Sequence, residues 1–558
     1  MKFFSSIVVL VLSHSVAFAE ADSDLITIFD EMVVEGHQSK LIGDSISASE
    51  GVISAKEIAL RPILRTGEVL EFVPGMVVTQ HSGSGKANQY FLRGYNLDHG
   101  TDFRTVVDGM PVNMRSHGHG QGYSDLNFIV PEFVEHIAYQ KGPYHAENGD
   151  FSTAGSASFH LTDKIKQPFA KVEVGKDQFF RTVLAGTVES DLGNLSLGLE
   201  THQYNGPWKD IEEDVEKFNA MARLVSPVNA GELSLTFLAY ENDWNSADQI
   251  PQRAIDQGRI NRLGSLDEQV GGDASRYSIS TQWHGKEWSM NAYAIRSKLD
   301  LFSNFTYFLD DPVNGDQFEQ VDSRTIYGAS IQRQIISHID DRHLRQNYGL
   351  QLQFDDIDDV ALYRTANLNR LSTVRQDQVK EYSVAAFWEG ELELIQDWYA
   401  MIGVRYDYLA IDVDSDFAAN GGDANDGLLS FKSGLSYQFN EDIEFYANFG
   451  QSFHSNDARG ATITVDPVTG DPADSVDLLV RGKGGEIGFR YHDDEKFNLS
   501  AALWVLELDS ELLFVGDAGN TEASRPSRRS GVEIAAYYWF DNHFGVDLEL
   551  SWSHSQFY

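Results

Sequence analysis

The sequence predicts a membrane β-barrel that follows a small N-terminal α+β domain. From residue 167 onward, runs of alternating apolar and polar side chains recur between clusters of Asp, Asn and Gly, which is typical of strands. No stretch beyond the N-terminus approaches the roughly 20 apolar residues of a transmembrane helix. Strands that cross lipid must close into a barrel, because every backbone group needs a partner there. Soluble β-sandwiches alternate too, so the segments below decide between the two.

The N-terminus has the pattern of a secretory signal peptide. Lys2 gives a positive start, residues 3–16 are mostly apolar, and Ala17-Phe18-Ala19 fits the small-x-small cleavage pattern. The alternative is a membrane anchor, which the short apolar run disfavours because hydrocarbon is about 30 Å thick. We therefore expect residues 1–19 to be removed on export.

The composition restricts the possible partners. The 558 residues include 43 Lys and Arg against 84 Asp and Glu, which gives a formal net charge of −41. Nucleic-acid binding needs a basic patch, so this acidity argues against a nucleic-acid partner. Cysteine is absent, so an exported form cannot rely on disulfides and must be stabilised by backbone pairing and packing.

Residues 51–163 are predicted to form the α+β domain. Ser54 and Glu57 have the spacing of a capping box at the start of a short helix. A second helix is predicted over residues 67–72, where the apolar positions end at Pro74-Gly75.

A strand and a tight turn lie further along this domain. Residues 105–107 form a short β-prone run that leads into Asp108-Gly109, a turn dipeptide. Pro111 follows and bars a regular central strand. The pattern predicts a compact, turn-rich domain with a small sheet.

Short motifs follow one another in a fixed order through this domain. They occupy residues 66–75, 91–94, 105–112, 139–144 and 154–157, and their most specific members are Arg93, Gly94, Asp108, Gly109, Pro111, Lys141, Gly142 and Pro143. In this order and spacing the set resembles the plug domain of TonB-dependent outer-membrane receptors, over roughly residues 29–163. The resemblance implies a plug in the lumen of a barrel in the outer membrane of a Gram-negative bacterium, surrounded by lipid and lipopolysaccharide.

A short apolar run between acidic residues precedes the plug. In the receptor family, such an element near the mature N-terminus is the TonB box, which pairs with a strand of TonB, the periplasmic partner energised by an inner-membrane complex. Main-chain hydrogen bonds would give this pairing its affinity for TonB, and the side chains would give it selectivity. The alternative is the first strand of the plug, but the position next to the signal peptide favours the TonB box within residues 20–50. The coupling residues would be Asp30, Glu31, Met32, Val33, Val34 and Glu35.

Histidines are concentrated in the plug, most densely in residues 116–123. In an extended backbone His117 and His119 point to the same side, so both imidazoles could approach one metal ion. A metal site normally needs three or four ligands, so the alternative stays open that these histidines bond within the plug or to the barrel wall. The candidate ligand contacts are His81, Asp98, His99, His117, His119 and Tyr123.

Residues 164–558 are assigned to the barrel. The clearest strands are predicted at residues 178–189, 194–204, 232–242, 287–299, 347–355, 403–412 and 498–508, and residues 243–274 and 455–478 are expected to be extracellular loops. We count about 17 strand candidates, whereas plugged outer-membrane transporters close with about 22. The final alternation lapses at His554 and Gln556. We therefore expect a chain that lacks its last strands.

The resemblance implies TonB-dependent active uptake of a scarce nutrient, with an iron–siderophore complex or another metal chelate favoured by the plug histidines. An organic nutrient such as an oligosaccharide is the alternative ligand. A passive channel or adhesin would need neither plug nor TonB box. No cofactor is expected, and no Ser-His-Asp or paired-carboxylate arrangement is identifiable from spacing, so we do not expect an enzyme.

Overall fold

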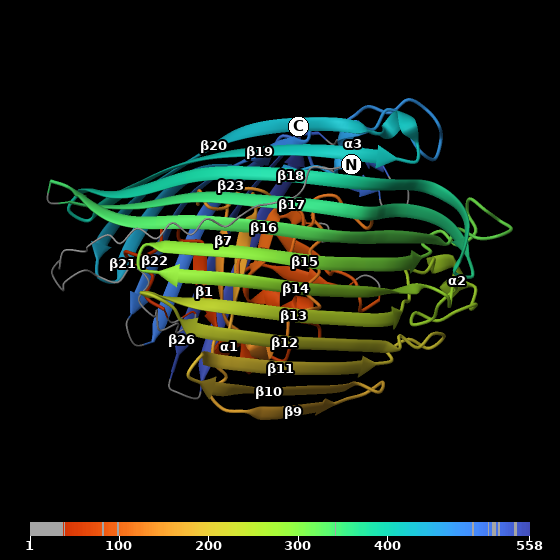
Figure 1. Ribbon diagram of the computed structural model, residues 1–558, viewed down its shortest axis with the longest axis horizontal. Coiled ribbons are helices and arrows are strands. Elements are labelled where there is room, and N and C mark those ends of the chain that lie inside the picture. The colour runs from red at the N-terminus through yellow and green to blue at the C-terminus, as the bar shows by residue number, and fades with distance from the viewer. Residues whose placement is uncertain are drawn as a thin grey trace.

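The computed structural model describes residues 37, 39–80, 83–97, 100–340, 342–493, 496–511, 513–515, 520–522, 525–540 and 544–558. A small N-terminal plug, red to orange in Figure 1, lies inside a large antiparallel barrel that runs from yellow to blue. The predicted combination of an α+β plug and a β-barrel is therefore confirmed.

The plug contains two small sheets and three short helices among the described residues. One sheet has five strands in the order β1-β7-β8-β5-β6, and the other has three in the order β2-β3-β4. The elements are β1 (Glu50–Ser54), α1 (Ala55–Leu60), η2 (Thr66–Phe72), β2 (Val77–Thr79), β3 (Gln89–Leu92), β4 (Tyr95–Asn96), β5 (Phe103–Val107), β6 (Met110–Pro111), η3 (Pro131–Phe133), β7 (Val134–Lys141) and β8 (Gly155–Leu161).

The local predictions for the plug are confirmed, with one difference in helix type. Ser54 and Glu57 form the capping box, in which the backbone N–H of each donates to the side chain of the other. The second predicted helix is the 3-10 helix η2, which ends before Pro74. Asp108 (φ 46°) and Gly109 (φ 74°) make the tight turn between β5 and β6. Strand β6 ends at Pro111, on the edge of its sheet, where a missing N–H is tolerated.

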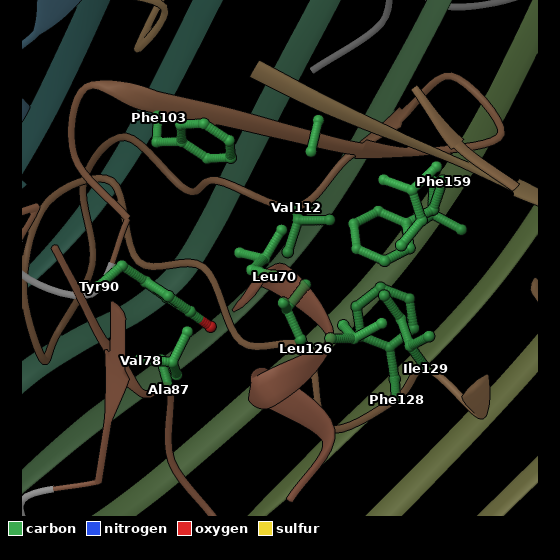
Figure 2. Packing of buried hydrophobic residues seen from close by; sticks show 14 of the residues in the cluster. Leu70, Val78, Ala87, Tyr90, Phe103, Val112, Leu126, Phe128, Ile129 and Phe159 are labelled. Atoms are coloured by element: carbon green, nitrogen blue, oxygen red, sulfur yellow. The ribbon is translucent and has the colours of Figure 1, made fainter. Parts of the chain in front are cut away.

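The plug core is a cluster of fully buried apolar side chains (Figure 2). Leu70, Tyr90, Phe103 and Phe159 are each at most 2% exposed. The cluster continues into the barrel wall, where inward-facing residues of several strands pack against it. Burial of each such side chain contributes about 1.5–3 kcal/mol, so apolar packing fixes one side of the plug to the wall. The wall residues include Val183, Met221, Leu238, Ile295, Trp504 and Leu506.

Among the described residues, 17 strands make up the barrel, which is the number expected from the sequence pattern. All seven clearest predicted strands overlap observed ones. The barrel strands are β9 (Phe169–Val174), β10 (Phe180–Ser190), β11 (Gly193–Tyr204), β12 (Val215–Pro227), β13 (Gly231–Asn245), β14 (Gly271–Gly285), β15 (Trp288–Ser303), β16 (Phe318–Ile339), β17 (Arg342–Ala366), β18 (Asn369–Ile395), β19 (Trp398–Ser415), β20 (Gly422–Asn440), β21 (Ile443–Ser455), β22 (Leu479–Asp493), β23 (Phe497–Leu508), β26 (Ser527–Trp539) and β27 (Gly545–Phe557).

The strands alternate between the outer surface and the lumen as predicted. On β13, Leu235 and Phe237 are each 45% exposed on the outside, whereas Ser234 and Thr236 are buried against the lumen. No described helix is long and apolar enough to cross a membrane.

Long and short connections lie at opposite ends of the barrel. Because consecutive strands are antiparallel, the connections β13–β14, β15–β16 and β21–β22 share one end, which we call the loop end. The first holds α2 (Gln252–Asp256) and the third holds α3 (Ala458–Thr462), where long insertions were predicted. At the other end, the turn end, β10 and β11 are separated by only two residues.

Candidate functional site

The histidine-rich segment of residues 116–123 is the plug apex loop, and it lies against the barrel wall near the loop end. A bridge between Met114 and Tyr123 closes the loop. The Gly118 N–H donates to Asp322 of β16 (3.1 Å). A Cβ added at Gly118 would lie 2.5 Å from the carbonyl oxygen of Val321, so only glycine allows this close approach.

His117 is buried and held on three sides. Its ring stacks on Tyr123 with centroids 4.0 Å apart, its Nδ1 accepts from the His119 N–H (3.1 Å), and its Nε2 lies 3.9 Å from Asp322. Burial lowers the pKa of His117 to about 3, although Asp322 opposes this, so the imidazole is neutral at physiological pH. His119 Nδ1 lies 2.8 Å from the amide oxygen of Gln320.

The contacts of the two histidines match the alternative of bonding within the plug and to the wall. Among the described residues, no group of three or more His, Asp or Glu side chains is arranged to hold a metal ion. Metal binding by His117 and His119 stays a prediction.

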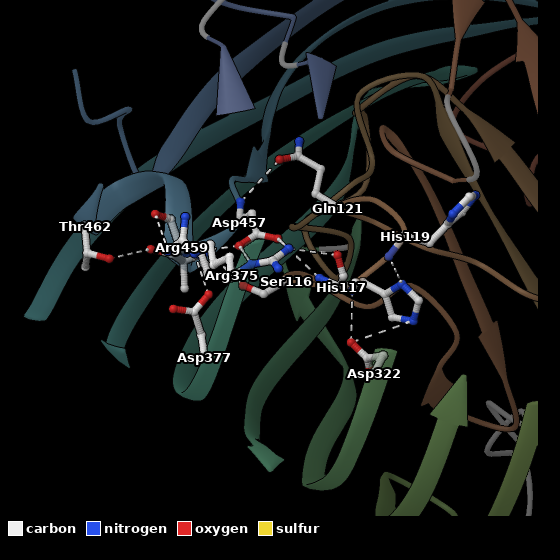
Figure 3. Close-up of polar contacts among 12 residues, drawn as sticks. Ser116, His117, His119, Gln121, Asp322, Arg375, Asp377, Asp457, Arg459 and Thr462 are labelled. Carbon is white, nitrogen blue, oxygen red and sulfur yellow. Dashed lines mark hydrogen bonds and ion pairs between the residues drawn. The ribbon is translucent and has the colours of Figure 1, made fainter. Parts of the chain in front are cut away.

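The β21–β22 loop folds inward onto the apex loop (Figure 3). His117 N–H donates to Asp457 (3.3 Å), and the Asp457 N–H donates to the amide oxygen of Gln121 (3.2 Å). The Ala458 N–H donates to the Ser116 hydroxyl (2.8 Å), and Arg459 donates to the carbonyl oxygen of His117 (2.9 Å). We call this set of contacts the latch. Four hydrogen bonds thereby join the β21–β22 loop to the plug.

Salt bridges fix the geometry of the latch. Arg459 pairs with Asp457 at 2.7 Å, and both side chains are at most 4% exposed. The charge of Asp457 raises the pKa of Arg459 above its usual value although burial lowers it, so the pair stays ionised. Arg375 of β18 donates to the carbonyl oxygen of Arg459 (3.3 Å) and pairs with Asp377. The loop is therefore held to the wall as well as to the plug.

A second polar cluster joins the plug to the barrel deeper in the lumen. Arg93 contacts Glu486 (3.0 Å) and Glu533 (2.9 Å), and Lys141 contacts Glu533 (2.8 Å). All four side chains are at most 7% exposed. The predicted plug motif therefore supplies two cations that the barrel neutralises, and we call this set the deep ion cluster.

The Asp108-Gly109 turn has a similar role. Asp108 pairs with Arg223 of β12 at 2.6 Å, and its main-chain oxygen accepts from Asn291 of β15 (2.8 Å). Burial raises the pKa of Asp108, and the charge of Arg223 opposes this. A residue predicted from the sequence as a turn former thus also attaches the plug to the wall.

Comparison with known proteins agrees with this architecture. Residues 218–557 match the family model described as "TonB dependent receptor-like, beta-barrel", and residues 44–156 match "TonB-dependent Receptor Plug Domain". The first match covers more than half of the chain. The chain belongs to the TonB-dependent receptor family. Members of this family with this fold are outer-membrane transporters or receptors of Gram-negative bacteria and are not enzymes.

Solved structures of TonB-dependent receptors share the fold at low identity. The unliganded ferric citrate transporter FecA matches with a TM-score of 0.73 and 14% identity over 93% of this chain and 80% of that chain. The siderophore receptor PiuA from Acinetobacter baumannii matches with a TM-score of 0.71 and 14% identity over 91% of this chain and 79% of that chain. The copper transporter OprC matches with a TM-score of 0.69 and 15% identity over 91% of this chain and 79% of that chain. Identities this low establish the fold alone.

Several residues expected to take part in coupling or ligand binding lie outside the described residues. These are Asp30, Glu31, Met32, Val33, Val34, Glu35, His81, Asp98 and His99. Of the other ligand candidates, His117, His119 and Tyr123 lie together in the apex loop. Asp457, Arg459, Glu486 and Glu533 were not predicted from the sequence, because charged residues are abundant and nothing in the local pattern distinguishes these from the rest.

Among the described plug histidines, His145 has a charge that should affect stability near neutral pH. His145 Nε2 lies 2.8 Å from Glu50 of β1, and its Nδ1 lies 3.9 Å from Glu389 of β18. Burial lowers the pKa of His145, but the two carboxylates outweigh burial and raise it well above the usual value. A raised pKa contributes stability that is complete below about pH 6.5, the unfolded value, and is lost as pH rises through the folded value.

We therefore expect the difference in unfolding free energy between wild type and His145→Gln to shrink from pH 6.5 upward. The change should be about 1.4 kcal/mol for each unit by which the pKa is raised. Denaturant titrations of the purified receptor at pH 6 and pH 9 measure it. His136→Gln is the matched control, because burial lowers the pKa of His136 to about 3 and it is already neutral in this range. Equal pH dependence in wild type and His145→Gln would contradict the assignment.

Proposed function

We propose that the receptor takes up a metal complex, such as an iron–siderophore complex, across the outer membrane by TonB-dependent transport. Membership of the TonB-dependent receptor family supports transport, and the similar structures include a copper transporter, a ferric citrate transporter and a siderophore receptor. The observation that carries the proposal is the latch, in which the β21–β22 loop contacts the plug apex directly. A ligand that binds at the loop end would meet both parts at once.

The latch suggests how binding is transmitted. A ligand that competes for the Ser116 hydroxyl or the His117 carbonyl oxygen would release Ala458 and Arg459 from the plug. Only a difference in ligand affinity between the latched and released states is needed, because such a difference shifts their populations. Residues 30–35 would then become accessible to TonB, which would pull on the plug from the periplasm.

Other functions find less support. A passive channel is disfavoured because the plug occupies the lumen and its apolar core packs into the wall. An organic nutrient, such as an oligosaccharide, is the alternative ligand. No contact described above favours it over a metal complex.

Growth of the host under nutrient depletion tests the proposal. We expect a deletion strain to grow more slowly than wild type under depletion of iron, zinc, copper or cobalamin, and the transcript to rise under the same condition. A response to one depletion names the ligand class and makes His117→Ala and His119→Ala the first variants for uptake assays. No response to any of the four would overturn a metal complex as the substrate and favour an organic nutrient.

A further inference from the structure

The five-stranded plug sheet has two chemically different faces. Phe103, Ala157 and Phe159 point into the apolar core and are at most 2% exposed. Because side chains alternate along strands, the neighbouring positions point the other way. This second face, the polar face, carries Arg104, Ser156, Ser158, His160, His136 and Gln140.

The barrel wall opposite the polar face is also polar. Gln282 pairs with Asn291, Asn291 with Ser330, and Ser330 with Gln351 in successive strands from β14 to β17. The pairs place short hydroxyl and amide side chains in one row across the wall. The apolar contacts that β15 and β16 make with the plug, at Ile295 and Ile326, lie at other positions along these strands.

A cavity of about 280 Å³ separates the two polar surfaces. At about 30 Å³ each, some nine water molecules would fill it. Arg115, directly before the apex loop, lines one end of the cavity. Gln282 and Ser289, close to the β14–β15 turn, line the other. The cavity therefore extends from beneath the latch toward the turn end of the barrel.

The charges that line the cavity are mostly paired. Arg115 binds Asp150 at 2.8 Å, and Arg405 binds Asp407 at 2.7 Å. Arg104 is different, because among the described residues no carboxylate lies within ion-pair distance of it. Its Nη1 donates to the side-chain oxygen of Asn148 (3.0 Å). No other hydrogen bond of its guanidinium is found in the described part of the chain.

The surroundings of Arg104 favour an added negative charge. Burial lowers its pKa and the neighbouring Arg405 lowers it further, while Glu147, Asp150 and Tyr293 only partly compensate. Glu147 also lines the cavity, and it forms no ion pair with any described cation. A guanidinium with free donors is well suited to bind a carboxylate or another oxyanion.

We propose that this cavity is the route by which the ligand crosses the barrel, and that Arg104 binds an oxyanion group of the ligand on the way. The proposal rests on the proposed transport function and adds to it a path and a ligand class. Polar contacts can be exchanged for contacts with a hydrophilic ligand, whereas opening the apolar side of the plug would expose its core to water. The ligand would therefore be a polar chelate or nutrient that carries carboxylate-like groups.

The absence of cysteine allows a direct test by thiol labelling. Ser158→Cys places a thiol on the plug side of the cavity, and Ser330→Cys places one on the wall side. Ser278→Cys is the matched control, because Ser278 also faces inward but pairs with Leu238 and Ile295 of the apolar core. The probes are the anionic sulfonatoethyl and the cationic trimethylammonium-ethyl methanethiosulfonates, applied to the receptor in outer-membrane vesicles.

We expect both cavity variants to react at least about tenfold faster than Ser278→Cys. We also expect the anionic reagent to react faster than the cationic one at Ser158→Cys, and Arg104→Gln to remove that preference. Equal rates at the cavity and control positions would overturn the route. A charge preference that survives Arg104→Gln, or no preference at all, would overturn the role of Arg104.

Uptake after labelling distinguishes an accessible cavity from a route. Modification of Ser330→Cys should stop growth on the limiting nutrient, while treated Ser278→Cys cells keep growing. Continued growth with Ser330→Cys fully modified would mean that the ligand passes elsewhere. The labelling rates require no ligand and no TonB, so failure of the proposed function in the depletion experiment would leave them as an independent result.

Discussion

Replacement of Val33 by proline should reduce nutrient uptake to the level of a strain without TonB. Proline removes the backbone N–H and fixes φ near −65°, so the segment of residues 30–35 would lose a main-chain hydrogen bond at the centre of its pairing with a TonB strand. Val33 precedes the first described residue, His37, whose N–H donates to Glu57 of α1 (2.9 Å). Val33 lies outside the described residues, so the amount of folded barrel is measured separately.

Uptake of the limiting nutrient in Val33→Pro, Val33→Ile and wild-type cells gives the measurement. Val33→Ile is the matched control, because it keeps the N–H and the β-branched side chain and should transport normally. Heat-modifiable migration on gels should show the same amount of folded barrel in all three. Normal uptake with Val33→Pro would mean that residues 30–35 are not the TonB box, and the alternative of a first plug strand would take its place.

The features predicted correctly from sequence are those fixed by residues close together in the chain. The Ser54–Glu57 capping box and the Asp108-Gly109 turn each depend on a few neighbouring positions. The strands of the barrel were recognised because alternation repeats within each of them, for example at Leu235 and Thr236. Local geometry alone decides such patterns, so one sequence is enough to find them.

The polar contacts between plug and barrel could not be predicted in the same way. Arg93 and Glu533 are separated by 440 positions, and His117 and Arg459 by 342. Which inward-facing side chain of the wall meets a given plug residue depends on strand register and on the seating of the plug. Neither strand register nor plug position can be recognised in the local sequence. A shift of the strand register by one residue would turn an inward-facing side chain to the outer surface of the barrel.

The orientation of the two apex-loop histidines also depends on contacts with residues far away in the sequence. The expectation that His117 and His119 point to one side was based on an extended backbone. In the structure the apex loop closes through Met114 and Tyr123, and His117 stacks on Tyr123 while His119 meets that ring edge-on. Tertiary contacts with β16 decide the orientation of both rings.

Replacement of Glu533 by alanine should weaken the attachment of the plug to the barrel and lower the free energy of unfolding. In Glu533→Ala, Arg93 would keep its contact with Glu486. Lys141 would stay buried without its carboxylate partner in the deep ion cluster. Removal of one partner from a buried ion pair typically costs about 3–5 kcal/mol, because the remaining charge stays desolvated. We therefore expect the free energy of unfolding to fall by this amount in denaturant titrations of the purified receptor.

Glu507→Ala is the matched control for this prediction. Glu507 lies on the neighbouring strand β23 and is 3.6 Å from Arg528, but both side chains are partly exposed. A surface pair of this kind contributes about 0–1 kcal/mol, so the control should behave almost like wild type. Equal stability of the two variants would show that the deep ion cluster does not hold the plug.

The same variant should also change how the plug responds to force. The apolar side of the plug is stabilised by contacts that are costly to open, whereas the ions of the deep cluster can be rehydrated or paired with new partners once the plug begins to move. In Glu533→Ala one polar attachment of the plug is already weakened, so entry of large antibiotics that wild-type barrels exclude should increase, even with Val33→Pro in the same chain. If stability falls as expected but antibiotic sensitivity is unchanged, the apolar packing of the plug, and not the deep ion cluster, keeps the barrel closed.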